Sequence, residues 1–208
     1  KGHWLAREIL AYWKRTLKRV DLTSRSLVAL IEPGSCFVGT LAELAFACDR
    51  SFMLSGGLPG DNRPPATVTL TALNFGAYPM SNGLSRLATR FLGEPESVDK
   101  AKAESGKPLE AEDCESLGLV TSAPDHIDWE GEVRIFLEER SSFSADGLTG
   151  MEANLRFAGP ETMETKIFGR LTAWQNWIFQ RPNAVGEKGA LTLYGQAGVR
   201  PVFDMRRT

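Results

Sequence analysis

The sequence predicts a layered α/β fold followed by a helical C-terminal segment. Through about the first 120 residues, short apolar runs of strand length alternate with stretches whose apolar residues recur at helical spacing. Turns rich in glycine and proline separate these stretches. Beyond about residue 150 the pattern is helical and rich in aromatic residues. We therefore predict an α/β core over residues 1–140 and a helical assembly segment over residues 141–208.

The expected elements follow in chain order. An amphipathic helix spans residues 5–20, with apolar residues on one side and basic residues largely on the other. Strands are expected at 26–31, 51–54, 67–71 and 119–121, with a long loop over 55–65. Helices are expected after Thr40, from Ser81 or Asn82 to residue 92, twice within 95–118, over 130–140, over 151–179 with a break at Gly159, and after Gly186. The remaining segments are a connector over 141–150, a helix stop at Pro182 and an irregular tail from Pro201.

Composition excludes several classes of function. The chain has 208 residues with 24 basic and 26 acidic side chains. This net charge of −2 does not indicate the excess of basic residues that is typical of nucleic-acid-binding proteins. No apolar run approaches the roughly 20 residues that span a membrane, and no signal-peptide pattern is present. Cys36, Cys48 and Cys114 are odd in number and widely spaced, so we expect no disulfide framework and a reducing cytoplasm. His3 and His126 lack the spacing of a metal site, so no metal is expected.

The most informative segment is residues 39–49, GTLAELAFACD. A glycine turn here leads from a buried strand into a helix, whose first N–H groups and positive dipole end can stabilise an oxyanion. Gly39 and Thr40 are therefore candidate oxyanion or CoA-binding residues. Glu43 lies one turn into the helix and is either a general acid or base or the partner of an N-capping Thr40 in a capping box.

Three blocks in register resemble the crotonase (enoyl-CoA hydratase/isomerase) superfamily. They are residues 39–49, residues 74–87 (NFGAYPMSNGLSRL) and residues 106–120 (GKPLEAEDCESLGLV). The resemblance implies the family's spiral of β-β-α units, here N-terminally incomplete, and an acyl-CoA substrate. Residues 150–185 extend it to the C-terminal half of the benzoyl-CoA-dihydrodiol lyase family. That family opens the ring of an oxygenated, dearomatised benzoyl-CoA in aerobic benzoate breakdown.

The resemblance also implies partners. They are the N-terminal half of the same protein, which carries the working glutamate pair in that family, and further copies in a homo-oligomer. It implies no cofactor beyond the coenzyme A of the substrate.

Several positions depart from the crotonase pattern. Thr40 stands where the family has its oxyanion glycine, Ala72 stands near the position of the second carboxylate, and Met80 replaces a further glycine. The loop that supplies the first oxyanion N–H lies outside this sequence. We therefore interpret the chain as a non-catalytic half that serves as scaffold and assembly surface. The polar cluster Asp61, Asn62 and Arg63 is interpreted as part of a surface loop.

Two alternatives remain open. One is a stand-alone crotonase-type acyl-CoA hydratase or hydrolase that uses Glu43. The other is a structural module that dimerises through its C-terminal helices.

Overall fold

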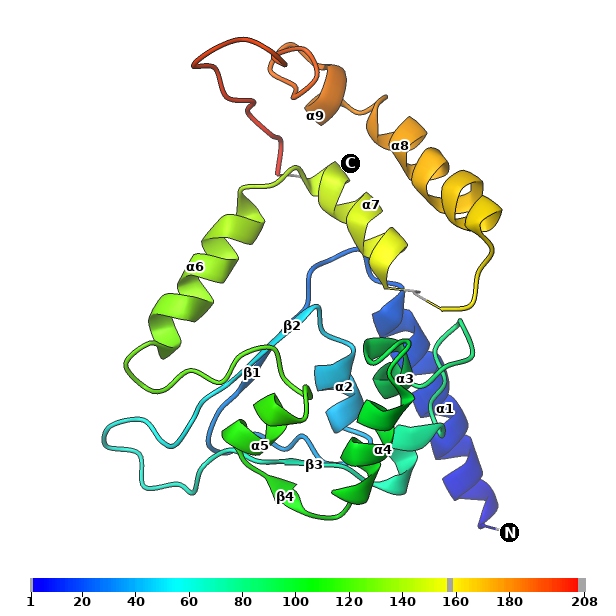
Figure 1. Ribbon diagram of the computed structural model, residues 1–208, viewed down its shortest axis with the longest axis vertical. Helices are drawn as coiled ribbons and strands as arrows, with labels where there is room; N and C mark the ends of the chain where they lie inside the picture. Colours follow the sequence, from blue (N-terminus) through cyan, green and yellow to red (C-terminus); the bar gives the residue numbers. More distant parts are fainter. Residues whose placement is uncertain (1, 157–158, 206–208) are drawn as a thin grey trace. The chain divides into compact units, whose positions relative to one another are not determined.

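A computed structural model describes residues 2–156 and 159–205 of the chain. The chain forms two compact units, Lys1–Arg134 and Ile135–Thr208. The division falls within helix α6 (Trp129–Ser141), which confirms the helix predicted over 130–140 (Figure 1). Each unit is described by itself.

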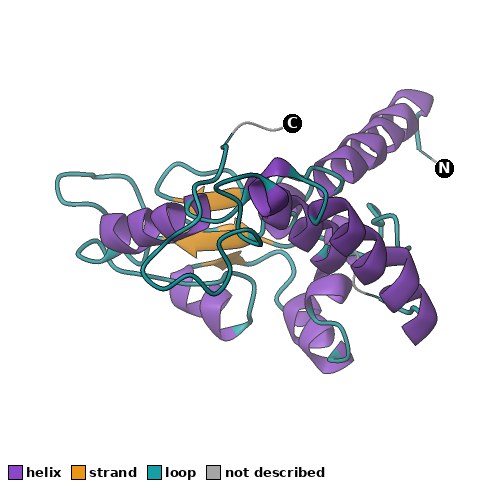
Figure 2. Cartoon of the chain, turned by 90° about the horizontal axis from the view of Figure 1, so that it is seen from above, coloured by secondary structure: helices purple, strands orange, loops and turns teal. Residues whose placement is uncertain are grey.

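The first unit begins with helix α1 and a parallel strand pair. Helix α1 (Trp4–Asp21) confirms the first predicted helix, and the His3 side chain caps it by accepting from the Leu5 N–H at 3.2 Å. Strand β1 (Val28–Ile31) pairs in parallel with β2 (Arg50–Met53), with Val28 opposite Arg50. Helix α2 (Ala42–Phe46) provides the crossover between them, as a parallel pair requires. Figure 2 shows the strands in orange and α1 extending away from them toward its N-terminal end.

A second, antiparallel pair consists of β3 (Val68–Thr69) and β4 (Pro108–Leu109). Strand β3 is shorter than predicted, and β4 was not predicted because it has only two residues. Isolated bridges join Val38 to Thr69 and Phe52 to Ser122. The strand predicted at 119–121 is therefore wrong: the isolated bridge to β2 is made by Ser122, one residue beyond this segment, and no ladder forms.

The helices on the C-terminal side of β3 are short. They are η1 (Ala72–Phe75), α3 (Arg86–Arg90), α4 (Pro95–Ala103) and α5 (Ala111–Ser116). The two helices predicted within 95–118 are confirmed. The predicted start of α3 at Ser81 or Asn82 is wrong, because a turn closed by the Met80 N–H and the Leu84 carbonyl comes first. Ser85 is the N-cap, and its hydroxyl accepts from the Ala88 N–H at 3.0 Å.

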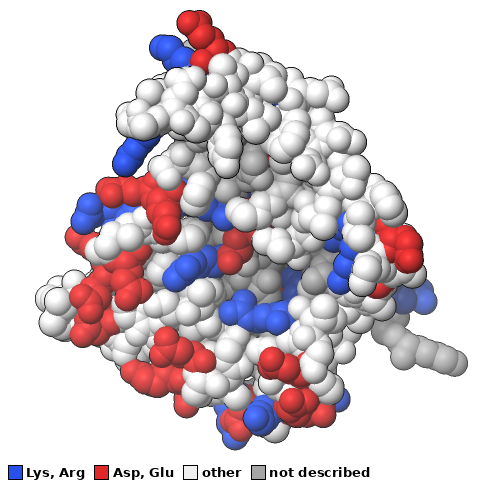
Figure 3. All heavy atoms as spheres, turned by 45° about the horizontal axis from the view of Figure 1, so that its top comes forward, with Lys and Arg blue, Asp and Glu red and all other residues white. Residues whose placement is uncertain are grey.

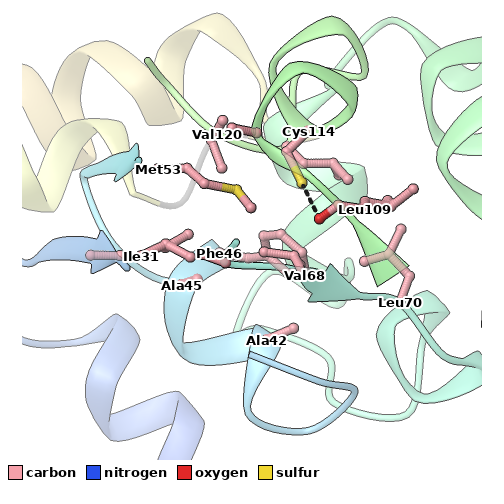
Figure 4. Close-up of a cluster of buried hydrophobic side chains, with 14 of the residues drawn as sticks. Ile31, Ala42, Ala45, Phe46, Met53, Val68, Leu70, Leu109, Cys114 and Val120 are labelled. Atoms are coloured by element: carbon pink, nitrogen blue, oxygen red, sulfur yellow. Dashed lines mark hydrogen bonds between the residues drawn. The ribbon is translucent and has the colours of Figure 1, made fainter. Parts of the chain in front are cut away.

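One cluster of buried apolar side chains forms the core of the first unit (Figure 4). Ile31 from β1, Met53 from β2 and Val68 from β3 are almost completely buried. Cys114 from α5 is fully buried and its thiol donates to the Leu109 carbonyl at 3.6 Å. Burial raises the pKa of the Cys114 thiol to about 12, so it packs as a small apolar group.

The second unit is helical and begins earlier than predicted. Helix α7 (Ala145–Leu155) occupies most of the predicted connector 141–150, which is therefore wrong. Ser144 caps it, and Gly150 is required within it, because a Cβ there would lie 2.7 Å from the Ile178 side chain. The glycine thus marks a close contact between two helices and not a loop.

The rest of the second unit departs from one continuous helix. After the break near Gly159, a π-helical stretch η2 (Thr165–Leu171) leads into α8 (Thr172–Ile178). Residues 157 and 158 of the predicted helix 151–179 lie outside the described residues. The last helix, α9 (Pro182–Val185), lies before Gly186 and not after it, because Pro182 begins a helix at its first position instead of stopping one.

Polar contacts hold the second unit together. Asp146 accepts from Asn183 Nδ2 at 3.0 Å and from Arg181 Nε at 3.3 Å. Glu152 pairs with both Arg140 and Arg156. Within the described part of this unit, the alanine at 184 is the one apolar residue that is buried.

Charged side chains of both signs are interspersed on the face shown in Figure 3, and a wide area of that face carries neither. Among the described residues, no helix is both long enough and apolar enough to cross a bilayer.

Candidate functional site

Glu43, the candidate acid or base, lies in the interior of the first unit. Helix α2 presents it on its buried face together with Ala42 and Ala45. Its side chain is 1% exposed. A charged carboxylate at this depth needs compensating partners, because burial without them is strongly unfavourable.

Both Glu43 carboxylate oxygens have such partners. Oε1 accepts from Asn74 Nδ2 at 2.7 Å, and Oε2 accepts from Arg86 Nη1 at 2.8 Å. The predicted capping box is wrong: the N-cap of α2 is Leu41, and no side chain caps the helix. The short helix α2 turns Glu43 toward the interior, where the guanidinium of α3 is the stronger partner.

Arg86 is the centre of this network. Its Nε and Nη2 donate to the two carboxylate oxygens of Asp21, at 3.0 and 2.6 Å. Its Nη1 also donates to the Tyr78 carbonyl at 3.1 Å. Arg86 and Asp21 are each 1% exposed, so one guanidinium joins the end of α1 to the middle of α2 inside the core.

The network holds two carboxylates and one guanidinium. Desolvation raises the pKa of Glu43, and the neighbouring Asp21 charge raises it further. Hydrogen bonds from Asn74 and Arg86, and the charge of Arg86, act in the opposite direction but do not cancel the effect of burial. The raised pKa therefore follows chiefly from burial of the carboxyl, with a smaller contribution from the neighbouring Asp21 charge.

Gly39 does not offer a free donor. Its N–H donates to the Thr69 carbonyl at 2.9 Å, and its carbonyl accepts from Asn74 Nδ2 at 2.8 Å. Its φ of +50° and the Thr71 hydroxyl, 3.0 Å from where a Cβ would lie, explain why glycine is required. Gly39 thus has a structural role in the turn.

Thr40 retains an available donor. Among the described residues, no acceptor bonds to its backbone N–H. Its hydroxyl lies 2.8 Å from the hydroxyl of Tyr78, a residue of the loop before α3. Of the predicted oxyanion residues, Thr40 alone can present its N–H to a ligand.

The second catalytic carboxylate remains absent from the expected place. Ala72 is the first residue of η1 and is exposed. The polar residue that η1 sends inward is Asn74, whose Oδ1 also accepts from the Thr71 N–H at 2.9 Å. Elsewhere, Asp61 and Arg63 form an exposed ion pair at 2.6 Å, and Arg63 lowers the pKa of Asp61. No group of three or more potential metal ligands occurs among the described residues.

Three members of the network were not singled out from the sequence. Arg86 and Asn74 lie within the block at 74–87, which the resemblance already marked. Asp21 is an isolated acid at the end of a basic helix and carries no pattern of its own. Asp21 follows Leu17 by one helical turn and so shares its buried face. This spacing was the feature of the sequence that could have indicated burial of Asp21.

The fold is that of the crotonases, present in part. An enoyl-CoA hydratase from Bacillus anthracis superposes with a TM-score of 0.65 at 16% identity, over 98% of this chain and 71% of that one. One from Thermoplasma volcanium GSS1 gives 0.63 at 16% identity, over 86% and 64%. No family model matches the chain.

One curated relative is much more similar in sequence. Over 207 residues, which is 100% of this chain, it is 54% identical to the benzoyl-CoA-dihydrodiol lyase of Aromatoleum evansii. This confirms the resemblance derived from the motifs. The chain spans 36% of that relative's length.

Proposed function

We propose that this chain is part of a CoA-thioester lyase that opens the ring of an oxygenated, dearomatised benzoyl-CoA. We further propose that this part supplies scaffold and assembly surface and not the reacting carboxylates. The observation that carries the second statement is the engagement of both Glu43 oxygens by Asn74 and Arg86 at 1% exposure. A carboxylate held in this way cannot reach a substrate proton without breaking a buried ion pair.

The lack of a second oxyanion N–H donor and of a second carboxylate supports the same proposal. Crotonase-type catalysis uses two N–H groups at the oxyanion and, in hydratases, two carboxylates. Losing one oxyanion donor typically costs about 10²–10³ in rate. Here Gly39 donates internally and Ala72 offers no titratable group. The working glutamates would then belong to the remaining part of the lyase, the N-terminal half that we propose as the principal partner.

Turnover tests this proposal. The chain alone should not convert the ring-oxygenated benzoyl-CoA substrate, and Glu43→Gln should change nothing but stability. Turnover by the chain alone that falls about a thousandfold in Glu43→Gln, with the fold retained by circular dichroism, would contradict it.

A second candidate is a stand-alone crotonase-type acyl-CoA hydratase or hydrolase. The Thr40 N–H favours it, because this donor lacks an acceptor among the described residues and belongs to a residue whose hydroxyl lies 2.8 Å from the Tyr78 hydroxyl. Crotonyl-CoA hydration is the appropriate assay. Activity that depends on Glu43 would support this candidate, whereas its absence would favour the scaffold.

We also propose homo-oligomerisation and a cytoplasmic location, with no cofactor beyond the coenzyme A of the substrate. The exposed apolar side chains of the second unit support assembly, among them Phe168 at 69% and Leu171 at 57% exposure. Three free cysteines, one of them exposed, support a reducing compartment. Light scattering before and after deletion of residues 160–208 tests the assembly surface, since an unchanged number of copies in the oligomer would contradict it.

A further inference from the structure

The turn before α3 contains an asparagine followed directly by a glycine, Asn82 and Gly83. Asparagine is one of the chemically labile residues of proteins. Its side-chain carbonyl carbon can be attacked by the backbone nitrogen of the next residue, and a glycine there has no Cβ to obstruct the approach. Of the six asparagines in the sequence, the one at position 82 alone precedes a glycine. Asn82 is therefore the asparagine whose neighbour best permits this ring closure.

The fold holds the Asn82 amide against the backbone of its own turn. Its Oδ1 accepts from the Leu84 N–H at 3.0 Å, so the side chain folds back along the Gly83 peptide. Its Nδ2 donates to Thr89 Oγ1, on α3, at 3.2 Å. The Met80 N–H closes the turn by donating to the Leu84 carbonyl at 2.8 Å, and Gly83 has a left-handed φ of +83°. The amide carbon is thus kept beside the Gly83 backbone.

These contacts suit the chemistry of ring closure. As the Gly83 nitrogen bonds to Cγ of Asn82, negative charge develops on Oδ1, where the Leu84 N–H can stabilise it. The Cγ–Nδ2 bond then breaks, and ammonia leaves with the proton that the Gly83 nitrogen gives up. The Thr89 hydroxyl lies at the departing nitrogen and can pass that proton on. The bond of 3.1 Å from the Gly83 N–H to the Met80 carbonyl has to open first, a local opening of one turn.

The two hydrolysis products differ in their effect on the backbone. Water opens the imide at either carbonyl, which gives aspartate or isoaspartate at position 82. Isoaspartate carries the main chain through the side-chain carbon and lengthens it by one atom. Both sides of the turn are anchored, because Arg86 Nη1 donates to the Tyr78 carbonyl at 3.1 Å and Ser85 caps α3. A longer turn would displace the start of α3, the helix drawn beside α2 in Figure 1, and Arg86 with it.

We propose that Asn82 and Gly83 form a site of spontaneous succinimide formation in the folded chain, and that isoaspartate formed there loosens the attachment of Arg86. Every reacting group lies within residues 80–89, so the reaction needs nothing from outside this segment except water. None of the reacting groups belongs to the Glu43–Arg86 network. Failure of this proposal would therefore leave the proposed function untouched.

Peptide mapping by mass spectrometry tests the modification. The folded chain is incubated in water enriched in heavy oxygen, which marks an imide that opens during the incubation. The amide of Asn82 should be replaced by a labelled acid, with both isomers present. Asn62 is exposed and precedes Arg63, so it is the internal control and should keep its amide. An intact Asn82 amide in the folded chain, or loss at Asn62 at the same rate, would overturn the proposal.

Two substitutions test the arrangement of the reacting groups. Gly83→Ala places a Cβ beside the attacking nitrogen and should slow the conversion several-fold. Nothing lies within 4 Å of that Cβ position, and circular dichroism shows whether the fold tolerates the left-handed backbone. Thr89→Val keeps the shape of the side chain but removes the hydroxyl, and should also slow the conversion. An unchanged rate in a folded sample of either variant would contradict the arrangement.

Urea unfolding separates the effect of the longer backbone from that of the new charge. Freshly purified Asn82→Asp carries the charge of the product on an ordinary backbone and is the matched control for the purified isoaspartate form. The isoaspartate form should unfold at a lower urea concentration than Asn82→Asp, because only the isoaspartate form displaces the start of α3. Equal midpoints would overturn the proposed effect on Arg86.

Discussion

The two units of the chain differ in the kinds of side chain that they bury. The first unit has a continuous apolar core, in which Ile31, Met53 and Leu70 are fully buried. The second unit has a similar proportion of apolar side chains, yet it buries polar groups such as Asp146, Glu152 and Asn183 and leaves Phe168 and Leu171 in solvent. The first unit is therefore stabilised by its own apolar core, whereas the exposed apolar side chains of the second unit are what the proposed assembly surface requires.

The buried ion-pair network provides the largest test of the first unit. Arg86→Met leaves the Asp21 and Glu43 carboxylates facing each other without a cation, and should lower the free energy of unfolding by about 3–5 kcal/mol. Urea unfolding measures it. Arg63→Met, which breaks the exposed pair with Asp61, is the control and should change nothing measurable. Equal effects of the two substitutions would contradict the assignment.

A pair of leucines tests the comparison itself. Leu70→Ala opens a cavity in the core and should cost about 2–5 kcal/mol in urea unfolding. Leu171→Ala removes a side chain that is 57% exposed and should cost less than about 0.5 kcal/mol. If Leu171→Ala cost as much as Leu70→Ala in a monomeric sample, the second unit would have a core of its own.

The turn before α2 should tolerate no side chain at Gly39. Gly39→Ala forces a left-handed backbone onto a residue with a Cβ and presses on Thr71, so we expect a loss of about 1–2 kcal/mol. Gly57→Ala is the matched control, since nothing lies within 4 Å of its Cβ position. Thermal unfolding of both variants distinguishes a local steric effect from a general loss of flexibility.

The smallest expected effect is a pH dependence. The pKa of Glu43 is raised in the folded state, so the proton is held more tightly there than in the unfolded chain. This contribution to stability is fully present below the unfolded pKa near 4.5 and is lost as pH rises through the higher folded pKa. Urea unfolding at several pH values should show a flatter profile for Glu43→Gln. An unchanged profile would mean that Glu43 does not carry this dependence.

Much of the fold could be predicted from the sequence. The period of the apolar residues placed α1, apolar runs placed the segments that form β1 and β2, and the three motif blocks placed Glu43 in a crotonase-type fold. The partners of Glu43 could not be placed, because Asp21, Asn74 and Arg86 meet through tertiary contacts between residues far apart in sequence. The capping box failed for the same reason: a buried guanidinium competes successfully with a local N–H for the carboxylate.

The second unit shows where residue types mislead. Gly147 and Gly150 made α7 look like a connector, although Gly150 permits close packing against Ile178. Pro182 looked like a stop and instead begins α9. In both cases the residue has two structural uses, and tertiary context selects between them.

The central claim is the proposal that this chain serves as scaffold within a larger lyase and lacks a working acyl-CoA site. Isothermal titration of the chain with benzoyl-CoA, beside coenzyme A alone, tests it most directly. The account predicts no binding of benzoyl-CoA beyond that of coenzyme A, in a sample shown to be folded by circular dichroism. Micromolar binding that requires the benzoyl thioester would contradict it, and would make Thr40 and Glu43 the first residues to substitute.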